Sequence, residues 1–476
     1  MKIKITVYLF LLLFSLNLFA QIGQEPAKKH EIKWWLTELD QSALFKQQSS
    51  ITAIDKIEKR YPTIEINTSE IFQTIDGFGF TLTGGSAIHI NSMSKNARQS
   101  LLKELFGTND TEIGISYLRI SIGASDLSDH VYSYDDIPLG QADPNLEHFN
   151  IDMEKKDLIP VLKQILEINP NVSILGSPWS APAWMKDNND SKGGSLKPEY
   201  FEVYAMYFVK YIKAMKNEGI NIKSITIQNE PLHPGNNPSM FMSADDQRLF
   251  LKNYLGPAFE RNNIKTKIVL YDHNADRIDY PISILNDIEA RKYADGSAFH
   301  LYAGEISELT NVHNAHPDKN IYFTEQWIGA PSNFAGDFSW HINNLIIGGT
   351  RNWCKTVLEW NLSSNPQLTP HTDRGGCSNC LGGITIDGDK VIHNPGYYII
   401  AHASKFIRPG SIRIGSNMPE NLNNAAFKTP NGKIVLIVQN NITNFQKFYV
   451  QSGKIIFVGS LNGGCVATYY FNLQDY

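Results

Sequence analysis

Two glutamates stand where the sequence changes from apolar to polar. Glu230 ends the run "SITIQNE" and Glu325 ends the run "NIYFTE". Two carboxyl groups that face each other can hydrolyse a glycosidic bond, because one protonates the leaving oxygen while the other acts as a nucleophile or activates water. A single glutamate in such a position is more often a solvated loop residue or an ion-pair partner. Two of them, each beside amide or aromatic residues, favour the catalytic interpretation.

Both glutamates close apolar runs of a repeating kind. Eight such runs are short and end in polar or aromatic residues: 76–84, 114–123, 173–180, 224–231, 267–274, 296–304, 320–327 and 356–363. Segments with helical periodicity separate many of them, most clearly 155–168 and 198–217. Alternating strands and helices predict parallel pairing with right-handed crossovers. Eight units predict an α/β fold, a closed (β/α)8 TIM barrel.

In a barrel of this type the carboxyl ends of the strands form the active site. The residues at those predicted ends are the candidates for catalysis and substrate binding: Arg119, Trp179, Asn229, Glu230, His300, Tyr302, Glu325, Trp327, Trp360 and Asn361. A carboxyl separation of roughly 5 Å would mean retention of anomeric configuration, and a wider gap would mean inversion. The sequence alone leaves this distance open.

The segments outside the predicted barrel are rich in strand-like runs. Residues 32–68 and 407–476 alternate such runs with turn signals such as "PNG". We expect a small β-sandwich built from both chain ends, with residues 21–70 and 405–476 flanking a catalytic barrel at 71–404. Residues 1–20, "MKIKITVYLFLLLFSLNLFA", combine early lysines with an apolar run too short to span a bilayer, which is typical of a cleaved signal peptide. We therefore expect an exported, periplasmic or extracellular protein without an integral membrane segment.

Composition excludes several classes of function. The chain has 476 residues, 42% of them hydrophobic and 19% charged, with a net charge of −5 and no run of Lys or Arg, so nucleic acid is not an expected partner. The sequence contains neither a Gly-x-Ser-x-Gly elbow nor a His-Glu-x-x-His zinc motif. In "GFGFTL", Leu82 stands where a dinucleotide-binding loop needs its third glycine. We expect no cofactor and no metal, and a monomer.

Four cysteines are too few for a disulfide framework in a chain of this length. Cys377 and Cys380 stand close together in "GGCSNC", and no second pair at matching spacing offers the partners of a zinc site. Export favours a local disulfide over two free thiols.

The ordered motifs resemble glycoside hydrolase family 30, the glucosylceramidase-like enzymes. The resemblance runs from about Asp76 to Pro395 through "GFGFTLTGGSA", "YLRISIGASDLS", "SPWSAPAWMK", "GSLKPEY", "QNEP", "HLY", "TEQW" and "EWNLSSN". It implies retention of configuration and no metal or organic cofactor. It also implies roles for single residues: Glu230 as acid/base, Glu325 as nucleophile, Asn229 as ligand of the sugar 2-hydroxyl, Trp179, Tyr302 and Trp360 as pocket aromatics, and Arg119 and His300 as supports of the carboxylates. On these roles, negative charge on Glu325 should raise the pKa of Glu230.

One departure from the family pattern concerns the substrate. Glucosylceramidases carry an acidic residue soon after the first strand, in a Thr-Asp-Ala pattern, and Gly84 stands at the matching position here. Loss of an acidic hydroxyl ligand argues against capture of a terminal glucose on a lipid and favours a polysaccharide. The "GGCSNC" loop likewise resembles members that cleave β-1,6-glucan. We therefore expect a β-1,6-glucan oligo- or polysaccharide as substrate, held by stacking on tryptophans that include Trp184.

Three alternatives stay open at this point. A glucosylceramidase or exo-β-glucosidase of the same family would release glucose from a chain end. A retaining glycosidase of another kind on the same barrel, such as a xylanase, would differ in the polysaccharide it cleaves. A sugar-binding protein on an inactive barrel would not need both glutamates.

Overall fold

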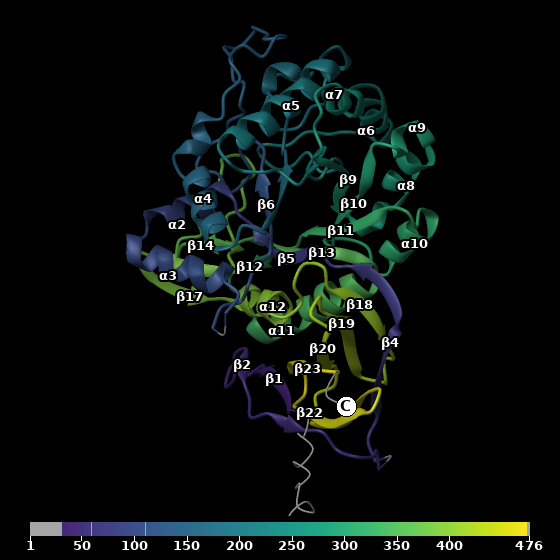
Figure 1. Ribbon diagram of the computed structural model, residues 1–476. Coiled ribbons are helices and arrows are strands. Elements are labelled where there is room, and N and C mark those ends of the chain that lie inside the picture. Colours follow the sequence, from purple (N-terminus) through teal and green to yellow (C-terminus); the bar gives the residue numbers. More distant parts are fainter. Residues whose placement is uncertain (1–30, 59, 110, 474–476) are drawn as a thin grey trace, which may run out of the picture.

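The computed structural model describes residues 31–58, 60–109 and 111–473. Within these residues the chain forms a barrel of parallel strands surrounded by helices, with an all-β domain packed below it in the view of Figure 1. The predicted signal peptide, residues 1–20, lies outside the described residues.

The barrel consists of eight strands, each hydrogen-bonded in parallel to its neighbours, and its last strand pairs with its first. In chain order these are β5 (Gly77–Thr81), β6 (Tyr117–Ser121), β7 (Ser173–Ser177), β8 (Ser224–Thr226), β9 (Lys267–Asn274), β10 (Ala294–His300), β11 (Asn320–Glu325) and β13 (Cys354–Asn361). Each overlaps one of the eight predicted runs. The predicted TIM barrel is therefore confirmed.

Helices connect successive barrel strands and cover the outside of the barrel (Figure 1). They are α2 (Gly84–Ser92), α3 (Lys95–Phe106), α4 (Leu158–Ile168), α5 (Phe201–Asn217), α6 (Ala244–Phe250), α7 (Gly256–Arg261), α8 (Asp279–Asn286), α9 (Ile288–Arg291), α10 (Glu308–Ala315), α11 (Phe334–His341) and α12 (Pro395–Ser404). In α4 the apolar residues at helical spacing, Leu158, Val161, Leu162 and Ile165, are buried. The two segments with clear helical periodicity thus form α4 and α5, each preceded by a short 3₁₀ turn.

The second domain is a sheet of ten strands that receives both ends of the chain. Its strands are β1 (Glu31–Thr37), β2 (Lys46–Gln47), β3 (Ile51–Thr52), β4 (Thr63–Thr74), β18 (Ile412–Ser416), β19 (Leu422–Lys428), β20 (Lys433–Asn440), β21 (Gln446–Ser452), β22 (Ile455–Leu461) and β23 (Val466–Asn472). β1 pairs with β23, and β4 lies between β18 and β21. The sheet curls so that the segment after β3 meets β22, where the Ile54 N–H donates to the Ile456 carbonyl at 2.7 Å. The predicted β-sandwich fed by both chain ends is confirmed.

Short strands extend the loops at the carboxyl ends of β11 and β13. β12 (Ile328–Gly329) pairs with β15 (Cys380–Leu381), and β14 (Ser363–Ser364) pairs with β16 (Ile384–Asp387), which continues into β17 (Lys390–His393). Cys377 and Cys380 form a disulfide, as predicted. Cys354 and Cys465 are buried free thiols.

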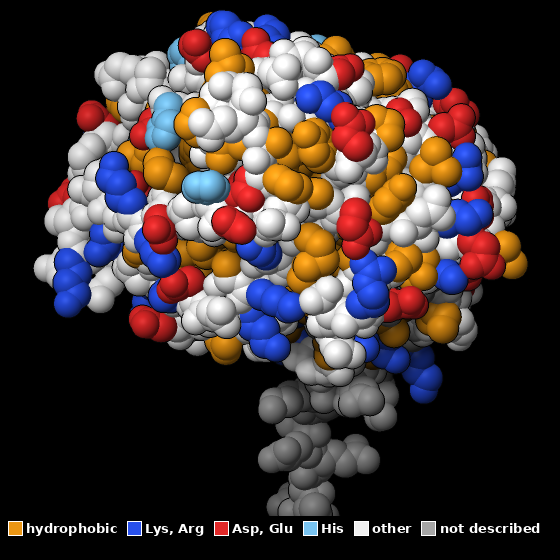
Figure 2. Space-filling model, turned by 90° about the horizontal axis from the view of Figure 1, so that it is seen from above, with side chains coloured by type: hydrophobic (Ala, Val, Ile, Leu, Met, Phe, Trp, Pro, Cys, Tyr) orange, Lys and Arg blue, Asp and Glu red, His pale blue; other side chains and the backbone are white. Residues whose placement is uncertain are grey.

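The face shown in Figure 2 carries charged side chains of both signs. Acidic and basic side chains are interspersed on it. In the described part of the chain, every helix is too short or too polar to cross a membrane.

Candidate active site

Glu230 and Glu325 lie at the carboxyl ends of β8 and β11 and line one pocket of about 380 Å³. Glu325 is the last residue of β11, whereas Glu230 follows β8 in a turn with a φ of 45°. A left-handed φ is uncommon for a residue with a side chain, and such strain is concentrated at functional sites. Two backbone hydrogen bonds hold this turn: the Asn229 N–H donates to the Pro178 carbonyl at 2.8 Å, and the Glu230 N–H donates to the Asp272 carbonyl at 3.0 Å.

The two carboxyl groups are close. A carboxylate oxygen of each and a ring nitrogen of His300 all lie within 4.8 Å of one another. His300 Nδ1 is 3.2 Å from Glu230 Oε1 and 3.8 Å from Glu325 Oε1. Retaining glycosidases separate their carboxyl groups by about 5–5.5 Å and inverting enzymes by about 6.5–9.5 Å. The distance that the sequence left open is therefore in the range of retention.

Arg119 of β6 lies beneath the two glutamates and binds one of them, Glu325. Its side chain is fully buried, and it donates from Nη1 to Glu325 Oε2 at 2.5 Å and from Nη2 to Asn229 Oδ1 at 2.6 Å. A second ion pair joins Nη2 to Asp272 Oδ2 at 2.8 Å. Burial opposes the charge of Arg119, but Asp272 and Glu325 outweigh it and raise the pKa of the guanidinium.

Asp272 is the centre of this buried network. Besides Arg119, it accepts hydrogen bonds from three hydroxyls at 2.6–2.7 Å and from His300 Nε2 at 3.2 Å; the hydroxyls belong to Ser177, Thr226 and Thr324. Burial alone would raise its pKa, but the charge of Arg119 and these donors hold the pKa of Asp272 well below its ordinary value. A permanent negative charge thus lies beneath the two glutamates.

A β-bulge explains why Asp272 was absent from the candidates. The pairing of β9 with β10 shifts register, so that Tyr271 faces Ala298 and His273 faces Phe299, with Asp272 as the extra residue. Tyr271 and Asp272 have φ values of 70° and 69°. A bulge re-aims a side chain and breaks the alternation that a sequence pattern relies on. The run "KIVLYDHN" therefore looks like an ordinary core strand.

His300 connects the network to both glutamates. Burial would lower its pKa, but the carboxylates of Glu325, Asp272 and Glu230 raise the pKa to about 9. The ring is therefore an imidazolium at neutral pH and donates from both nitrogens, to Glu230 and to Asp272.

The expectation that the pKa of Glu230 is raised is wrong. Burial favours the neutral form of Glu230, but the hydrogen bond and charge of His300 outweigh it and lower the pKa of Glu230. At Glu325, burial and the charge of Glu230 outweigh His300 and Arg119 and raise its pKa. The charge of His300 acts on both glutamates, but of the two only Glu230 forms a hydrogen bond with His300, at 3.2 Å, whereas Nδ1 of His300 is 3.8 Å from Glu325. Since the groups interact, they titrate as a unit.

Aromatic side chains form the walls above the carboxylates. Trp179, Trp327, Trp360 and Tyr302 line the pocket, as predicted from their strand ends. The rings of Trp179 and Trp360 lie 5.4 Å apart, and the guanidinium of Arg119 lies 4.7 Å from the Trp179 ring centre. The Tyr302 hydroxyl donates to Glu325 Oε1 at 3.0 Å. Burial and the nearby carboxylates raise the pKa of Tyr302 well above its ordinary value, so it remains a donor.

Several predicted residues do not reach the pocket. Arg119 and His300 are fully buried behind it, which fits a supporting position and not substrate contact. The amide nitrogen of Asn361 donates to the carbonyls of Ser363 and Cys380, so this side chain organises the loop after β13. Trp184 is a core residue and donates from its indole to the Asp135 carbonyl at 3.0 Å. Asn361 and Trp184 are therefore removed from the set of sugar contacts.

Five further polar residues line the pocket and were not among the candidates: Asp126, His233, Asn236, His273 and Asn274. Asp126 bears on the substrate prediction. The pocket contains an acidic side chain, Asp126, whereas Gly84, the position without one, starts α2, where an added Cβ would meet Ser128. Burial, followed by the charges of Glu325 and Glu230, raises the pKa of Asp126 to about 8.

The donor set does not suit a metal ion. Among the described residues, Glu230, His300 and Glu325 form a group whose ligand atoms are close enough together to bind a cation. His300 is protonated at neutral pH, and the guanidinium of Arg119 already occupies Glu325. A metal ion would have to replace the proton of His300 and would lie beside the positive charge of Arg119.

A larger cavity, about 930 Å³, lies at the opposite end of the barrel. Its lining includes Asp76, Ser173 and Lys223, which stand at the amino ends of β5, β7 and β8. In TIM barrels this end contributes to stability and the carboxyl end to function. The smaller pocket is thus the functional candidate.

Two family models match the chain. The Glycosyl hydrolase family 30 TIM-barrel domain matches residues 75–407, and the Glycosyl hydrolase family 30 beta sandwich domain matches residues 410–469. The chain belongs to glycoside hydrolase family 30. The resemblance inferred from the motifs is confirmed, and with it the assignment as a glycosidase.

Relatives within family 30 differ in their named activities. An endo-1,6-beta-D-glucanase of Aspergillus fumigatus is 35% identical over 410 residues, which span 80% of this chain and 81% of the relative. The lysosomal acid glucosylceramidase of Mus musculus is 28% identical over 430 residues, 85% of this chain and 82% of that protein. A solved endo-beta1,6-glucanase structure is similar, with a TM-score of 0.86 and 33% identity, and the match covers 93% of this chain and 100% of the other.

Proposed function

We propose that this family 30 glycosidase hydrolyses β-1,6-glucan by double displacement, with Glu325 as nucleophile and Glu230 as acid/base. The observation that carries the proposal is the geometry of the pair: their oxygens lie within 4.8 Å of each other at the floor of one pocket. That spacing leaves no room for a water between the two groups and a sugar carbon, so direct attack by a carboxylate is favoured.

In the first step, Glu325 attacks the anomeric carbon and Glu230 protonates the departing glycosidic oxygen. Arg119 and Tyr302 hold the two oxygens of Glu325 at 2.5 and 3.0 Å, and this fixes the carboxylate before the substrate arrives. The oxygen of Asn229 accepts from Arg119, so its amide N–H can donate to the 2-hydroxyl of the sugar.

In the second step, Glu230 acts as a base. It removes a proton from water, and the hydroxide attacks the anomeric carbon of the glycosyl-enzyme. The bond between that carbon and Glu325 breaks, and the configuration of the substrate is restored. The ion pair with Arg119 stabilises the carboxylate of Glu325 as it leaves.

The reaction needs an ionised Glu325 and a protonated Glu230, whereas the surroundings lower the pKa of Glu230 and raise that of Glu325. A bound sugar changes the balance. Its 2-hydroxyl can donate to the carboxylate of Glu325, and its glycosidic oxygen offers an acceptor to a protonated Glu230. Catalytic hydrogen bonds often form only in the complex with substrate. We infer that substrate binding favours protonation of Glu230 and ionisation of Glu325.

The substrate class rests on the relatives and on the pocket. Two similar proteins carry endo-1,6-glucanase names. Trp179, Trp327 and Trp360 offer faces on which sugar rings can stack, and the Asp126 carboxyl can bind a hydroxyl. We therefore expect oligosaccharides to appear early when a pustulan-type β-1,6-glucan is the substrate.

Product analysis tests the proposal. A pustulan-type glucan, an aryl β-glucoside and glucosylceramide should be compared at matched enzyme concentration, with the products separated over time. We expect the highest kcat/KM on the glucan, early oligosaccharides and β-configured products by NMR. A higher kcat/KM on glucosylceramide with glucose as the early product would overturn the glucan proposal, and α-configured products would overturn retention.

A glucosylceramidase is the second candidate. Asp126 supports it, because an acidic residue in the pocket can hold a terminal glucose, and the murine lysosomal acid glucosylceramidase is a relative. The substrate comparison above separates the two.

We also propose export, from the charged and apolar pattern of residues 1–20. Expression with its own amino terminus in a bacterial host should give a shortened protein outside the cytoplasm, beginning near Gln21 by mass spectrometry. Full-length protein confined to the cytoplasm would contradict this. Size-exclusion chromatography tests the expectation of a monomer.

A further inference from the structure

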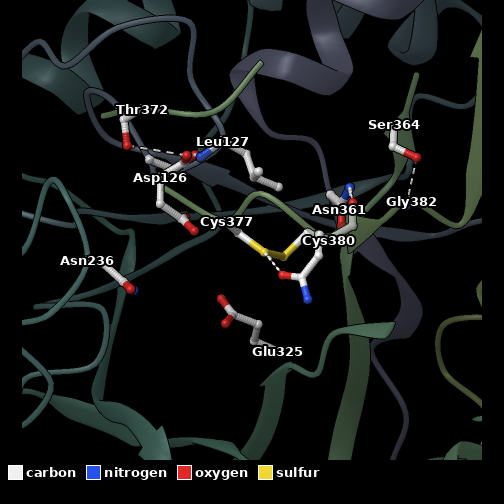
Figure 3. Close-up of a disulfide and its surroundings, with 12 residues drawn as sticks. Asp126, Leu127, Asn236, Glu325, Asn361, Ser364, Thr372, Cys377, Cys380 and Gly382 are labelled. Atoms are coloured by element: carbon white, nitrogen blue, oxygen red, sulfur yellow. Dashed lines mark hydrogen bonds between the residues drawn. A yellow bond between two sulfur atoms is a disulfide. The ribbon is translucent and has the colours of Figure 1, made fainter. Parts of the chain in front are cut away.

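The disulfide Cys377–Cys380 belongs to the wall of the active-site pocket. Both cysteines line the pocket that holds Glu230 and Glu325. They pack in one apolar cluster with Leu127 and three tryptophans of the site, Trp179, Trp327 and Trp360. In Figure 3 the sulfur atoms stand between Asp126 and Glu325, at the edge of the space that both carboxyls face. A sugar bound there would lie against the disulfide.

The segment that leads into the disulfide, residues 372–376, binds the backbone of Asp126. The N–H of Thr372 donates to the Asp126 carbonyl at 3.0 Å, and its hydroxyl approaches the same oxygen at 3.4 Å (Figure 3). Gly376 packs so closely here that an added Cβ would lie 2.9 Å from that oxygen and nearer still to Thr372. The segment before Cys377 therefore packs against the backbone of Asp126 and helps to position it.

The residues at the other end of the loop, Asn379 and Cys380, are hydrogen-bonded to the segment that follows Glu325. Cys380 pairs with Gly329 in the β12–β15 ladder, and the Ala330 N–H donates to the Asn379 carbonyl at 2.8 Å. These residues follow Glu325 by only a few positions. Cys380 is therefore attached to the nucleophile segment, and the residues just before Cys377 are attached to Asp126.

We propose that the Cys377–Cys380 disulfide is a positioning element for substrate binding, which keeps Asp126 and the tryptophan wall at a set distance from Glu325. The inference rests on the site being a glycosidase site. Each end of the loop is attached to a different side of the pocket, and the disulfide is the covalent bridge between them. Without the disulfide, only the backbone of Ser378 and Asn379 would connect Cys377 directly to Cys380. Rotation about those backbone torsions could then change the width of the pocket.

Two polar contacts of the same loop do not span the pocket. Arg374 forms an ion pair with Asp190 at 3.0 Å, but both side chains are largely exposed, so water and salt weaken it. Asn237 donates to Asp373 at 2.9 Å on the far side of the loop. Neither contact reaches the segment after Glu325. The Arg374 pair thus provides a matched control.

The buried network beneath the pocket does not depend on the loop. Arg119, Asp272 and His300 are held by strand residues, and none of their hydrogen-bond partners among the described residues comes from 372–382. The chemical step should therefore survive loss of the disulfide once substrate is bound. Binding should not, because it needs Asp126 and the tryptophan wall in place.

The test compares C377A/C380A with the wild type on an aryl β-glucoside and on a pustulan-type glucan. We expect KM to rise about tenfold on both substrates while kcat changes less than threefold, and R374Q to leave both constants within twofold. A phosphine reductant should raise the KM of the wild type and leave C377A/C380A unchanged. A disulfide with a purely stabilising role would instead lower the active fraction, with kcat falling and KM constant.

A double-mutant cycle shows whether the disulfide acts through Asp126. In a D126N background, C377A/C380A should change KM less than threefold, because the group it positions has already been altered. Fully additive effects, or an unchanged KM in C377A/C380A itself, would overturn the inference. If the wild type cleaves the aryl glucoside but not the glucan, the proposed substrate fails while the KM comparison on the aryl glucoside still decides the role of the disulfide.

Discussion

Two aspartates of the same site have opposite electrostatic states. Asp272 lies beneath the glutamates with no exposed surface, and Arg119, His300 and the Ser177 hydroxyl hold its pKa well below the ordinary value. Asp126 lies in the pocket wall and is 6% exposed, and burial beside two carboxylates raises its pKa to about 8. Burial is nearly equal, so the difference comes from the partners.

This contrast separates the floor of the site from its wall. The floor is complete in the absence of substrate: its charges are paired, and its hydrogen-bond donors are already aimed at Glu325 and Asp272. Such preorganisation is what stabilises charge in a transition state. In the wall, Asp126 is buried beside two other carboxyl groups. A hydrogen bond to a sugar hydroxyl would stabilise it better than these neighbours do. Changes in the floor should therefore alter kcat, and changes in the wall should alter KM.

The largest effect is expected for removal of the nucleophile from the floor. Glu325→Ala should lower kcat/KM by about 10⁴-fold or more, several kcal/mol of barrier, because no glycosyl-enzyme can form. Azide should restore part of the activity and give a glycosyl azide of inverted configuration, measured by NMR. Near-wild-type turnover of the natural substrate by Glu325→Ala would remove this residue from the proposed role.

Glu230→Gln should have the next largest effect. It removes the proton donor, so turnover should persist only on substrates with a good leaving group, with a loss of about 10²–10⁴-fold on the glucan. The alkaline limb of the kcat profile, which reports the substrate complex, should disappear, because glutamine has no proton to lose. A fall that remains near pH 9 belongs to His300, whose pKa is about 9. An alkaline limb unchanged near neutral pH would refute the acid/base role.

Asp272→Asn tests the floor without touching the reacting atoms. It leaves Arg119 with one carboxylate partner fewer, and breaking a buried ion pair typically costs about 3–5 kcal/mol of folding free energy. We expect kcat to fall about 10²-fold with KM within threefold, and the melting temperature to drop. Thr324→Val is the matched control, since it removes one hydroxyl donor to Asp272 and keeps the charges. A rise in KM at constant kcat would contradict the division between floor and wall.

The sequence allowed the barrel, the sandwich and most of the pocket to be predicted, for a physical reason. Parallel strands buried on both sides are continuous apolar runs, and their ends are marked where polar residues begin, as at Glu230 and Glu325. The pocket tryptophans at the ends of β7 and β13 follow from the same rule.

The residues that escaped prediction depend on backbone geometry that periodicity does not reveal. Asp272 points into the network through a β-bulge, and Asp126 reaches the pocket from a loop after β6 that returns beneath residues 372–376. A register shift between Glu359 and Asn361 interrupts the strand pattern, and the Asn361 side chain binds the following loop instead of lining the pocket. Gly84 marked only the absence of an acidic residue at one position of the sequence, and position along the chain does not show that Asp126 lies in the pocket. The pKa order of the glutamates depended on His300, whose distance to each could not be known.

The smallest effect on rate, and the one most specific to the wall, is expected for Asp126→Asn. The amide keeps the shape of the side chain and an acceptor oxygen, so KM on the glucan should rise about three- to tenfold, the value of one weakened hydrogen bond, while kcat stays within threefold.

The change in stability caused by Asp126→Asn has a defined sign with pH. The folded-state pKa of Asp126 is about 8 and its ordinary value is 3.8, so between pH 4 and pH 8 the folded protein holds a proton that the unfolded chain has lost, and this group makes stability fall as pH rises. Asparagine cannot titrate. The melting temperature of the variant minus that of the wild type should therefore grow from pH 4 to pH 8, with all other groups common to both proteins. A difference that stays constant across this range would show that Asp126 is ionised in the folded pocket, and the contrast with Asp272 would then not hold.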